Sequence, residues 1–112
     1  MKGDDAEQIA ADYLLHQGLV LIERNYRCRF GEIDLIMSEN SIIIFVEVRM
    51  RAHDKFGSAA ASITPAKQAK LVRAARHYLS GLKSDPACRF DALLISGAYH
   101  PEIEWIKNAF GE

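Results

Sequence analysis

Apolar residues recur along this chain with two different periods, and each period predicts a type of element. Near the N-terminus they follow the i, i+3, i+4, i+7, i+8 spacing of an amphipathic helix. Asp4 or Asp5 is suited to cap this helix, and Gly18 is suited to end it. The predicted apolar face consists of Ala6, Ile9, Ala10, Tyr13 and Leu14.

Shorter apolar runs predict β-strands near residues 19–26, 31–36, 45–49, 89–96 and 102–106. Residues 50–63 are rich in alanine and serine and predict a loop. A second helix begins at Thr64 as cap, with Pro65 in the first turn, and ends at Gly81. These elements predict an α/β protein.

The second helix has two chemically different sides. Its apolar side is formed by Leu71, Val72, Ala75, Tyr78 and Leu79, and Gln68 lies one turn earlier on that side. Another side carries Lys67, Lys70, Arg73 and His77. This basic side either faces solvent or contacts an acidic partner.

Acidic residues interrupt two of the apolar strands at alternating positions. Residues two apart in a strand share a face, so Glu32 lies beside Asp34, and Glu47 beside Arg49. The polar stretch 38–41 is short enough to join the two strands as an antiparallel hairpin. We therefore expect three carboxylates and one guanidinium to meet on one patch of the sheet.

The composition sets the class of protein. The chain has 112 residues, 49% of them hydrophobic, which predicts one domain over residues 1–112. Net charge is −1, but residues 49–77 are basic, with Asp54 as their only acid. Cys28 and Cys88 lack the spacing of a zinc site and are expected to be reduced, half-buried strand residues. No apolar stretch has signal-peptide or membrane-spanning character, so we expect a cytoplasmic protein.

Several motifs together resemble one known family. They are GEIDLI at 31–36, FVEVR at 45–49, RFD at 89–91 and NAF at 108–110, with a glycine-containing loop and a lysine- and alanine-rich helix between them. The chain resembles the YraN family of small bacterial proteins, which is similar to restriction-endonuclease-like nucleases and closest to archaeal Holliday junction resolvases. The resemblance implies a central mixed β-sheet flanked by helices.

The resemblance also implies a metal site. That superfamily places an Asp on one strand and Glu-x-Lys on the next, with a Glu on an upstream helix and a Gln or Lys on the following helix. Matched in order, Asp34 and Glu47 would bind a divalent cation, and Arg49 would stand at the lysine position. Glu7 and Gln68 would be the two helical residues. An arginine keeps its proton, so Arg49 can orient water or stabilise phosphate charge but cannot act as a base.

The chemistry of these residues supports the same function. Carboxylates such as Asp34 and Glu47 are suitable ligands for Mg²⁺ or Mn²⁺, and the Val48 carbonyl offers a third oxygen. Such a cation assists phosphodiester cleavage. We expect a metal-dependent endonuclease that cleaves DNA, including branched DNA. Residues expected to contact the DNA backbone are Arg51, Lys67, Lys70 and Arg73. Symmetric cleavage of a junction would favour a homodimer.

Other interpretations of the same residues stay open. One is an adaptor that binds nucleic acid with the nuclease fold but has lost turnover at Arg49. Another is a structural protein in which Asp34, Glu47 and Arg49 form an ion-pair network. Glu7 and Gln68 are equally suited to be ordinary polar residues on solvated helix surfaces. The basic side of the second helix is equally suited to face solvent.

Overall fold

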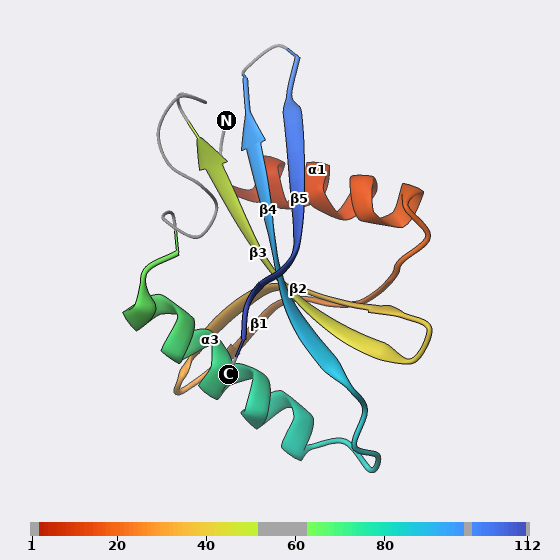
Figure 1. The fold of residues 1–112 in the computed structure, drawn as a ribbon, viewed down its shortest axis with the longest axis vertical. Helices are drawn as coiled ribbons and strands as arrows, with labels where there is room; N and C mark the ends of the chain where they lie inside the picture. Colours follow the sequence, from red (N-terminus) through yellow and green to blue (C-terminus); the bar gives the residue numbers. More distant parts are fainter. Residues whose placement is uncertain (1–2, 52–62, 98–99, 112) are drawn as a thin grey trace.

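The structure is a computed structural model that describes residues 3–51, 63–97 and 100–111, and it shows a mixed sheet with two helices (Figure 1). Along the chain come α1 (Gly3–His16), β1 (Val20–Cys28), β2 (Gly31–Glu39), β3 (Ile42–Arg51), α3 (Pro65–Ser80), β4 (Cys88–Ser96) and β5 (Glu102–Phe110). The strands lie in the order β1-β2-β3-β4-β5, and all neighbours are antiparallel except β3 and β4. The predicted α/β class is confirmed.

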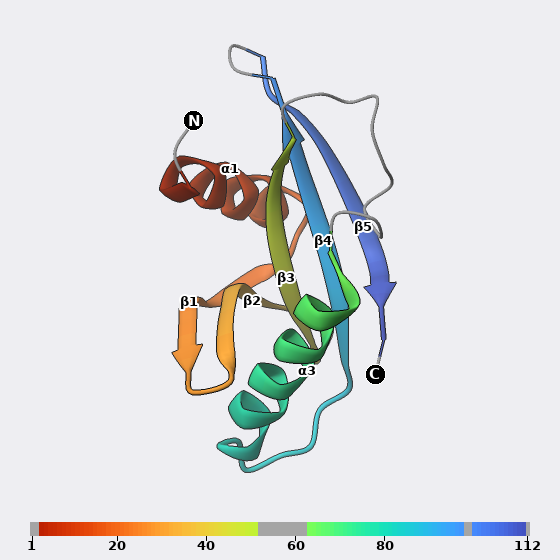
Figure 2. The same cartoon turned by 90° about the vertical axis from the view of Figure 1, so that its left-hand side faces the viewer.

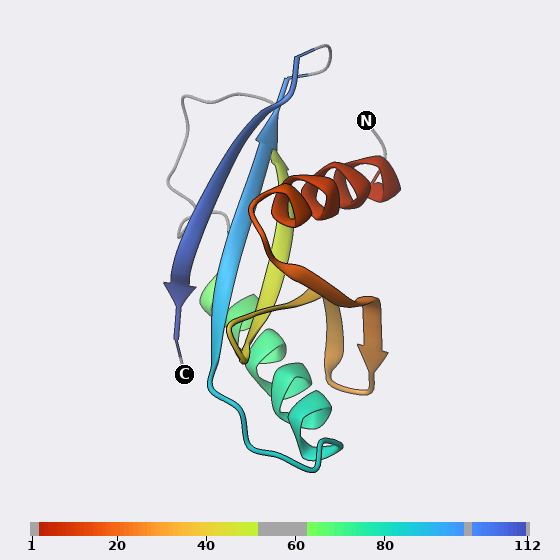
Figure 3. The same cartoon turned by 90° about the vertical axis from the view of Figure 1, so that its right-hand side faces the viewer.

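The two helices cover opposite faces of the sheet (Figures 2 and 3). One face packs against α3 through a core that includes Ile36, Phe45 and Phe90. The other packs against α1 through a core that includes Leu35 and Val46. Because α3 lies between the parallel strands β3 and β4 in the chain, it forms part of the crossover that parallel pairing requires.

Both ends of α3 lie where the sequence predicted them. The Thr64 hydroxyl oxygen accepts a hydrogen bond from the Lys67 N–H at 3.2 Å, Pro65 occupies the first turn, and Gly81 follows the last helical residue. The expected cap of α1 is wrong, because this helix already begins at Gly3, so Asp4 and Asp5 lie inside its first turn. Gly18, with φ +95°, follows its end as expected.

Pairing between strands extends all five of them beyond their predicted limits. β1 continues to Cys28, β5 continues to Phe110, and β4 begins at Cys88. β2 continues to Glu39 and β3 begins at Ile42, so the first half of the stretch 38–41, expected as a turn, belongs to β2. β3 continues through Met50 and Arg51, which were expected in a loop, because these residues pair with Ile95 and Ser96 of β4. The remainder of the expected loop, 52–62, lies outside the described residues. Both cysteine thiols are free, but Cys88 is exposed rather than half-buried because it begins its strand.

The β2–β3 hairpin has the register that the acidic pattern required. Its loop is Asn40–Ser41, both with positive φ (50° and 70°), as in the tight turns that match strand twist. Regular pairing runs from Glu39 opposite Ile42 to Leu35 opposite Val46 and stops there. The next residue of β2 is Asp34, so this acid lies where β2 and β3 part.

The side-chain alternation of β2 is interrupted at Asp34. Ile33 belongs to the core under α3, whereas Leu35, two residues later, belongs to the core under α1. The opposing strand is irregular at the same level, because Asn25 has φ 52° and its neighbours Arg24 and Tyr26 are the nearest paired residues. The β1–β2 hairpin therefore turns away from the sheet at Asp34 and leaves a gap beside β3.

Candidate metal and phosphate site

Asp34 replaces a missing backbone contact at the point where β2 leaves β3. Its Oδ2 accepts a hydrogen bond from the Val48 N–H at 2.9 Å. In a β-strand the N–H and C=O of one residue point to the same side. The Val48 carbonyl therefore also points toward the gap occupied by the Asp34 side chain.

Four carboxylates from three elements converge around this gap. Oxygen atoms of Glu7 on α1 and of Glu32 and Asp34 on β2 lie within 4.8 Å of one another. Glu47 on β3 is only 5% exposed and shares a hydrogen bond with Asp34. The expected meeting of Glu32, Asp34 and Glu47 thus occurs, and Glu7 joins it from the opposite face of the sheet.

The surroundings of Asp34 favour its protonated form. Burial, together with the hydrogen bond and the negative charge of Glu47, raises the pKa of Asp34 to about 8 from a usual value of 3.8. The Val48 N–H and Lys67 oppose this shift. At neutral pH the metal-free cluster therefore carries less negative charge than its number of carboxylates suggests.

Glu7 is a second carboxylate whose pKa is raised. Burial and the charge of Asp34 raise its pKa, against lowering by a hydrogen bond from Asn25 and by Arg24. Its Oε1 is buried and has no hydrogen-bond partner among the described residues. A buried oxygen without a partner costs free energy, and a bound cation would remove that cost.

Lys67 supplies a positive charge to the acidic cluster. It was expected to contact a DNA backbone, but its Nζ lies 3.1 Å from Glu47 Oε2. Arg49 also lines the acidic pocket, on the same side of β3 as Glu47. Two cationic side chains, one from α3 and one from β3, therefore stand beside the carboxylates.

The structure does not bring Gln68 to this cluster. Its Nε2 donates a hydrogen bond to the Ile63 carbonyl at 2.9 Å, and its side chain lines a different depression together with Arg73 and Arg76. Successive helical residues are rotated by about 100°, so Lys67 can face Asp34 only if Gln68 turns away. The side chain of Arg51 lies outside the described part of the structure.

Two adjoining hollows give access to the acids. One, of about 170 Å³, is lined by Ala6, Glu7, Asp34, Glu47, Val48, Arg49, Met50 and Lys67. The other, of about 240 Å³, is lined by Gly31, Glu32, Asp34, Glu47, Lys67, Lys70 and Leu71. Since a water molecule takes up about 30 Å³ of liquid, the first hollow has room for a cation with several waters. The donor set and the space fit Mg²⁺ or Mn²⁺.

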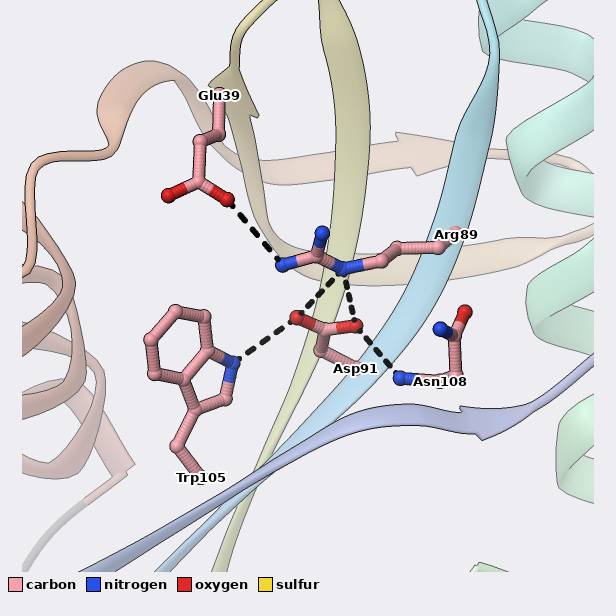
Figure 4. Close-up of polar contacts among 5 residues, drawn as sticks. All are labelled: Glu39, Arg89, Asp91, Trp105 and Asn108. Carbon is pink, nitrogen blue, oxygen red and sulfur yellow. Dashed lines mark hydrogen bonds and ion pairs between the residues drawn. The ribbon is translucent and has the colours of Figure 1, made fainter.

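A second buried carboxylate, Asp91 on β4, has a different environment (Figure 4). It is fully buried and accepts hydrogen bonds from Arg89 Nε at 3.0 and 3.2 Å, Trp105 Nε1 at 2.9 Å and the Asn108 N–H at 3.1 Å. Arg89 Nη2 in turn lies 3.7 Å from Glu39. Every oxygen of Asp91 is satisfied, so the RFD motif forms a structural network.

The arrangement of the sheet and its two helices indicates a fold class. A five-stranded mixed sheet with a helix on each face is compatible with a restriction-endonuclease-like fold. Neither described helix is long and apolar enough to cross a membrane.

The chain belongs to the uncharacterised protein family UPF0102, the YraN family, whose sequence profile matches residues 6–95. A UPF0102 protein of Nitrosomonas europaea is 66% identical over 111 residues, which cover 99% of this chain and 94% of that protein. A relative from Nitrosospira multiformis is 58% identical over 98% of this chain and 92% of its own length. One from Psychromonas ingrahamii is 50% identical over 99% and 90%. The resemblance seen in the sequence is confirmed.

Proposed function

We propose that this protein is a metal-dependent endonuclease that cleaves DNA phosphodiester bonds. The observation that carries the proposal is the pocket in which Asp34 and Glu47 share a hydrogen bond beside Lys67. Burying two carboxylates side by side costs free energy, which a bound cation would offset. A purely structural carboxylate in this protein, Asp91, is instead surrounded by hydrogen-bond donors.

Asp34, Glu47 and the Val48 carbonyl would hold Mg²⁺ or Mn²⁺. When bound, the cation would neutralise phosphate oxygens and lower the pKa of water. Glu7, with its unpartnered oxygen, and Glu32 would accept hydrogen bonds from waters around the cation. Binding would also release the proton held by the Asp34–Glu47 pair.

Lys67 and Arg49 would together perform the two roles of the single lysine in related nucleases, which are to orient water and to stabilise the phosphate. Arg49 stays charged and would stabilise the phosphate. Lys67 is a compact charge beside Glu47, suited to orient the attacking water. In this assignment Lys67 replaces Gln68 as the residue that α3 contributes to the site.

The remaining basic residues would contact the DNA backbone. Lys70 lines the second hollow beside Asp34 and Glu47, so it would meet a phosphate close to the reacting bond. Arg73 and Arg51 would contact phosphates farther away. Cleavage of a symmetric junction would require two copies of the protein, so we propose a homodimer on such substrates. A DNA substrate implies a cytoplasmic protein.

The test is a cleavage assay with purified protein on labelled four-way junctions, flaps, single strands and duplexes, with Mg²⁺ or Mn²⁺. Asp34→Asn and Glu47→Gln should abolish cleavage and weaken Mn²⁺ binding in calorimetry. Asp85→Asn is the matched control, because Asp85 is exposed after α3, and it should leave both unchanged.

Two results would contradict the proposal. Equal Mn²⁺ affinity in the wild type, Asp34→Asn and Glu47→Gln would remove the metal site. DNA binding without a metal-dependent product on any substrate, including with Arg49→Lys, would favour a nucleic-acid-binding adaptor instead.

A further inference from the structure

The tip of the β1–β2 hairpin carries an unusual pair of residues. Cys28 pairs with Gly31, so Arg29 and Phe30 form the two-residue loop. Such loops usually contain Gly, Asn, Asp or Ser, because these residues favour turn conformations. An arginine and a phenylalanine give no such conformational advantage. Their presence indicates a task for the side chains themselves.

Phe30 contacts exposed polar residues instead of the core. Arg29 Cζ lies 4.8 Å from the centre of its ring, and the His77 ring of α3 lies 5.8 Å away. Both neighbours are exposed, and Phe30 is half-buried. Tyr26 and Tyr78 pack against the core beneath α3, whereas Phe30 is not among the described residues that do so. Hydrophobic burial therefore does not account for Phe30.

The contacts beneath Phe30 hold it in place. His77 Nδ1 and the Tyr26 hydroxyl are hydrogen-bonded at 2.5 Å, and Tyr26 meets the Tyr78 ring edge-on at 5.3 Å. These contacts join the hairpin to α3. A ring on such a support loses little conformational freedom when a second flat group stacks against it.

The tip is continuous with the acidic site. The hollow that contains Asp34 and Glu47 reaches Gly31, the residue after Phe30, and Lys67 and Lys70 line its α3 side. Along α3, the eleven residues from Lys67 to His77 span about 15 Å. That length matches about four nucleotide steps of a stacked DNA strand at about 3.4 Å per step. A DNA strand whose phosphate lies at the carboxylates would thus bring a nearby base to the tip.

We infer that Phe30 and Arg29 form a stacking platform for an unpaired base, so that the substrate is DNA with a single-stranded segment next to the cleaved bond. This inference rests on the proposed nuclease function. Bases in a duplex are already stacked on each other, whereas an unpaired base offers a free ring face to an aromatic ring or a guanidinium. Lys70, which lines the adjoining hollow, would contact the backbone of the same strand.

The experiment measures binding without cleavage. Fluorescence anisotropy in EDTA would compare a labelled oligo-dT with a labelled hairpin duplex, using the full chain. Phe30→Leu keeps the apolar character but removes the ring, so it should weaken oligo-dT binding about tenfold or more and leave duplex binding unchanged. Phe30→Tyr should bind like the wild type. Val20→Ala, at an apolar position 59% exposed on β1, is the matched control and should also bind like the wild type.

A second variant reports stacking directly. Phe30→Trp places an indole at the tip, and oligo-dT should quench its fluorescence, while the wild type, with only Trp105, should show no comparable quenching. Melting temperatures would show that each variant is folded. The inference is overturned if Phe30→Leu binds oligo-dT like the wild type, or if it loses oligo-dT and duplex binding equally.

The outcomes separate this inference from the nuclease proposal. A protein that cleaves DNA but binds oligo-dT independently of Phe30 retains the proposed function and loses the platform. A protein that binds oligo-dT through Phe30 but cleaves no DNA retains the platform and loses the enzymatic function.

Discussion

Two buried aspartates of this protein differ in what satisfies them. Asp91 accepts hydrogen bonds on both oxygens from a guanidinium, an indole and a backbone amide. Asp34 has one backbone donor, and burial together with the hydrogen bond and charge of Glu47 raises its pKa to about 8. Burial alone therefore does not separate the candidate site carboxylate from the structural one, whereas the groups around each carboxylate do.

The raised pKa of Asp34 predicts how stability depends on pH without metal. The pKa of Asp34 is about 8 in the folded protein against 3.8 for a free side chain, so the folded state binds the proton more tightly than the unfolded state. The contribution of Asp34 to the free energy of unfolding is therefore fully present below about pH 4 and is lost as the pH rises toward 8. Asp34→Asn mimics the protonated form. In EDTA its melting temperature should exceed that of the wild type by an amount that grows from pH 4 to pH 8. A constant difference across this range would contradict the assignment.

Lys67 is predicted to act in the reaction and not in metal binding. Lys67→Ala should lower cleavage about a hundredfold, because a charge next to the reacting phosphate is removed. Mn²⁺ affinity should stay equal or rise, since Glu47 loses a competing partner. Gln68→Ala, at the next position of α3, is the control and should retain activity, because the Gln68 side chain points away from the acidic cluster. A parallel loss of Mn²⁺ binding in Lys67→Ala would assign Lys67 a structural role instead.

The ends of α3 are set by local residues, whereas its orientation against the sheet is set by the core. Its start depends on Thr64 and Pro65, which act within their own turn. Its rotation about its axis, set by packing of Leu71, Ala74 and Ala75 against the sheet, decides which side chain reaches Glu47. Local signals thus fix the length of this helix, and the core fixes which face meets the site.

The cap of α3 is a measurable part of its stability. Thr64→Ala should lower the free energy of unfolding by about 1 kcal/mol, because the Lys67 N–H loses its acceptor. Thr64→Ser keeps the hydroxyl and should stay close to the wild type. Chemical denaturation would measure both variants. Equal stability of Thr64→Ala and Thr64→Ser would show that the cap contributes nothing.

The whole sheet depends on contacts between strands that are distant in sequence. Asp91 on β4 joins Trp105 and Asn108 of β5, and Arg89 extends the network to Glu39 of β2 (Figure 4). None of the residues of this network lines the two hollows of the acidic site, and the network joins β2, β4 and β5 with β3 lying between β2 and β4.

Breaking this network should destabilise the molecule without changing the candidate metal site. Asp91→Asn would leave the mostly buried Arg89 guanidinium without its main counter-charge, at a cost of about 3 kcal/mol. Glu39→Gln removes only the 3.7 Å contact and should cost less than about 1 kcal/mol. Chemical denaturation with Mn²⁺ calorimetry on the folded variants would test this. Loss of Mn²⁺ binding in folded Asp91→Asn would contradict a purely structural role.

The sequence by itself determined the helix and strand types and the hairpin register that brings Asp34 and Glu47 together. These features follow from local periods and turn residues, which act over a few positions. The resemblance to a nuclease family pointed to Glu7, which does reach the cluster, and to Gln68, which does not. Spacing along a helix fixes which residues share a face, but not which face meets the sheet.

Only the tertiary structure decided the rest. The parallel pairing of β3 with β4 extended β3 through Arg51, because hydrogen bonds from a distant strand are invisible in local sequence. The bend at Asp34 opened the gap that admits Glu7 from the other face. Docking of α3 turned Lys67 toward Glu47 and Gln68 away. Each depends on packing between residues far apart in the chain, which no local pattern encodes.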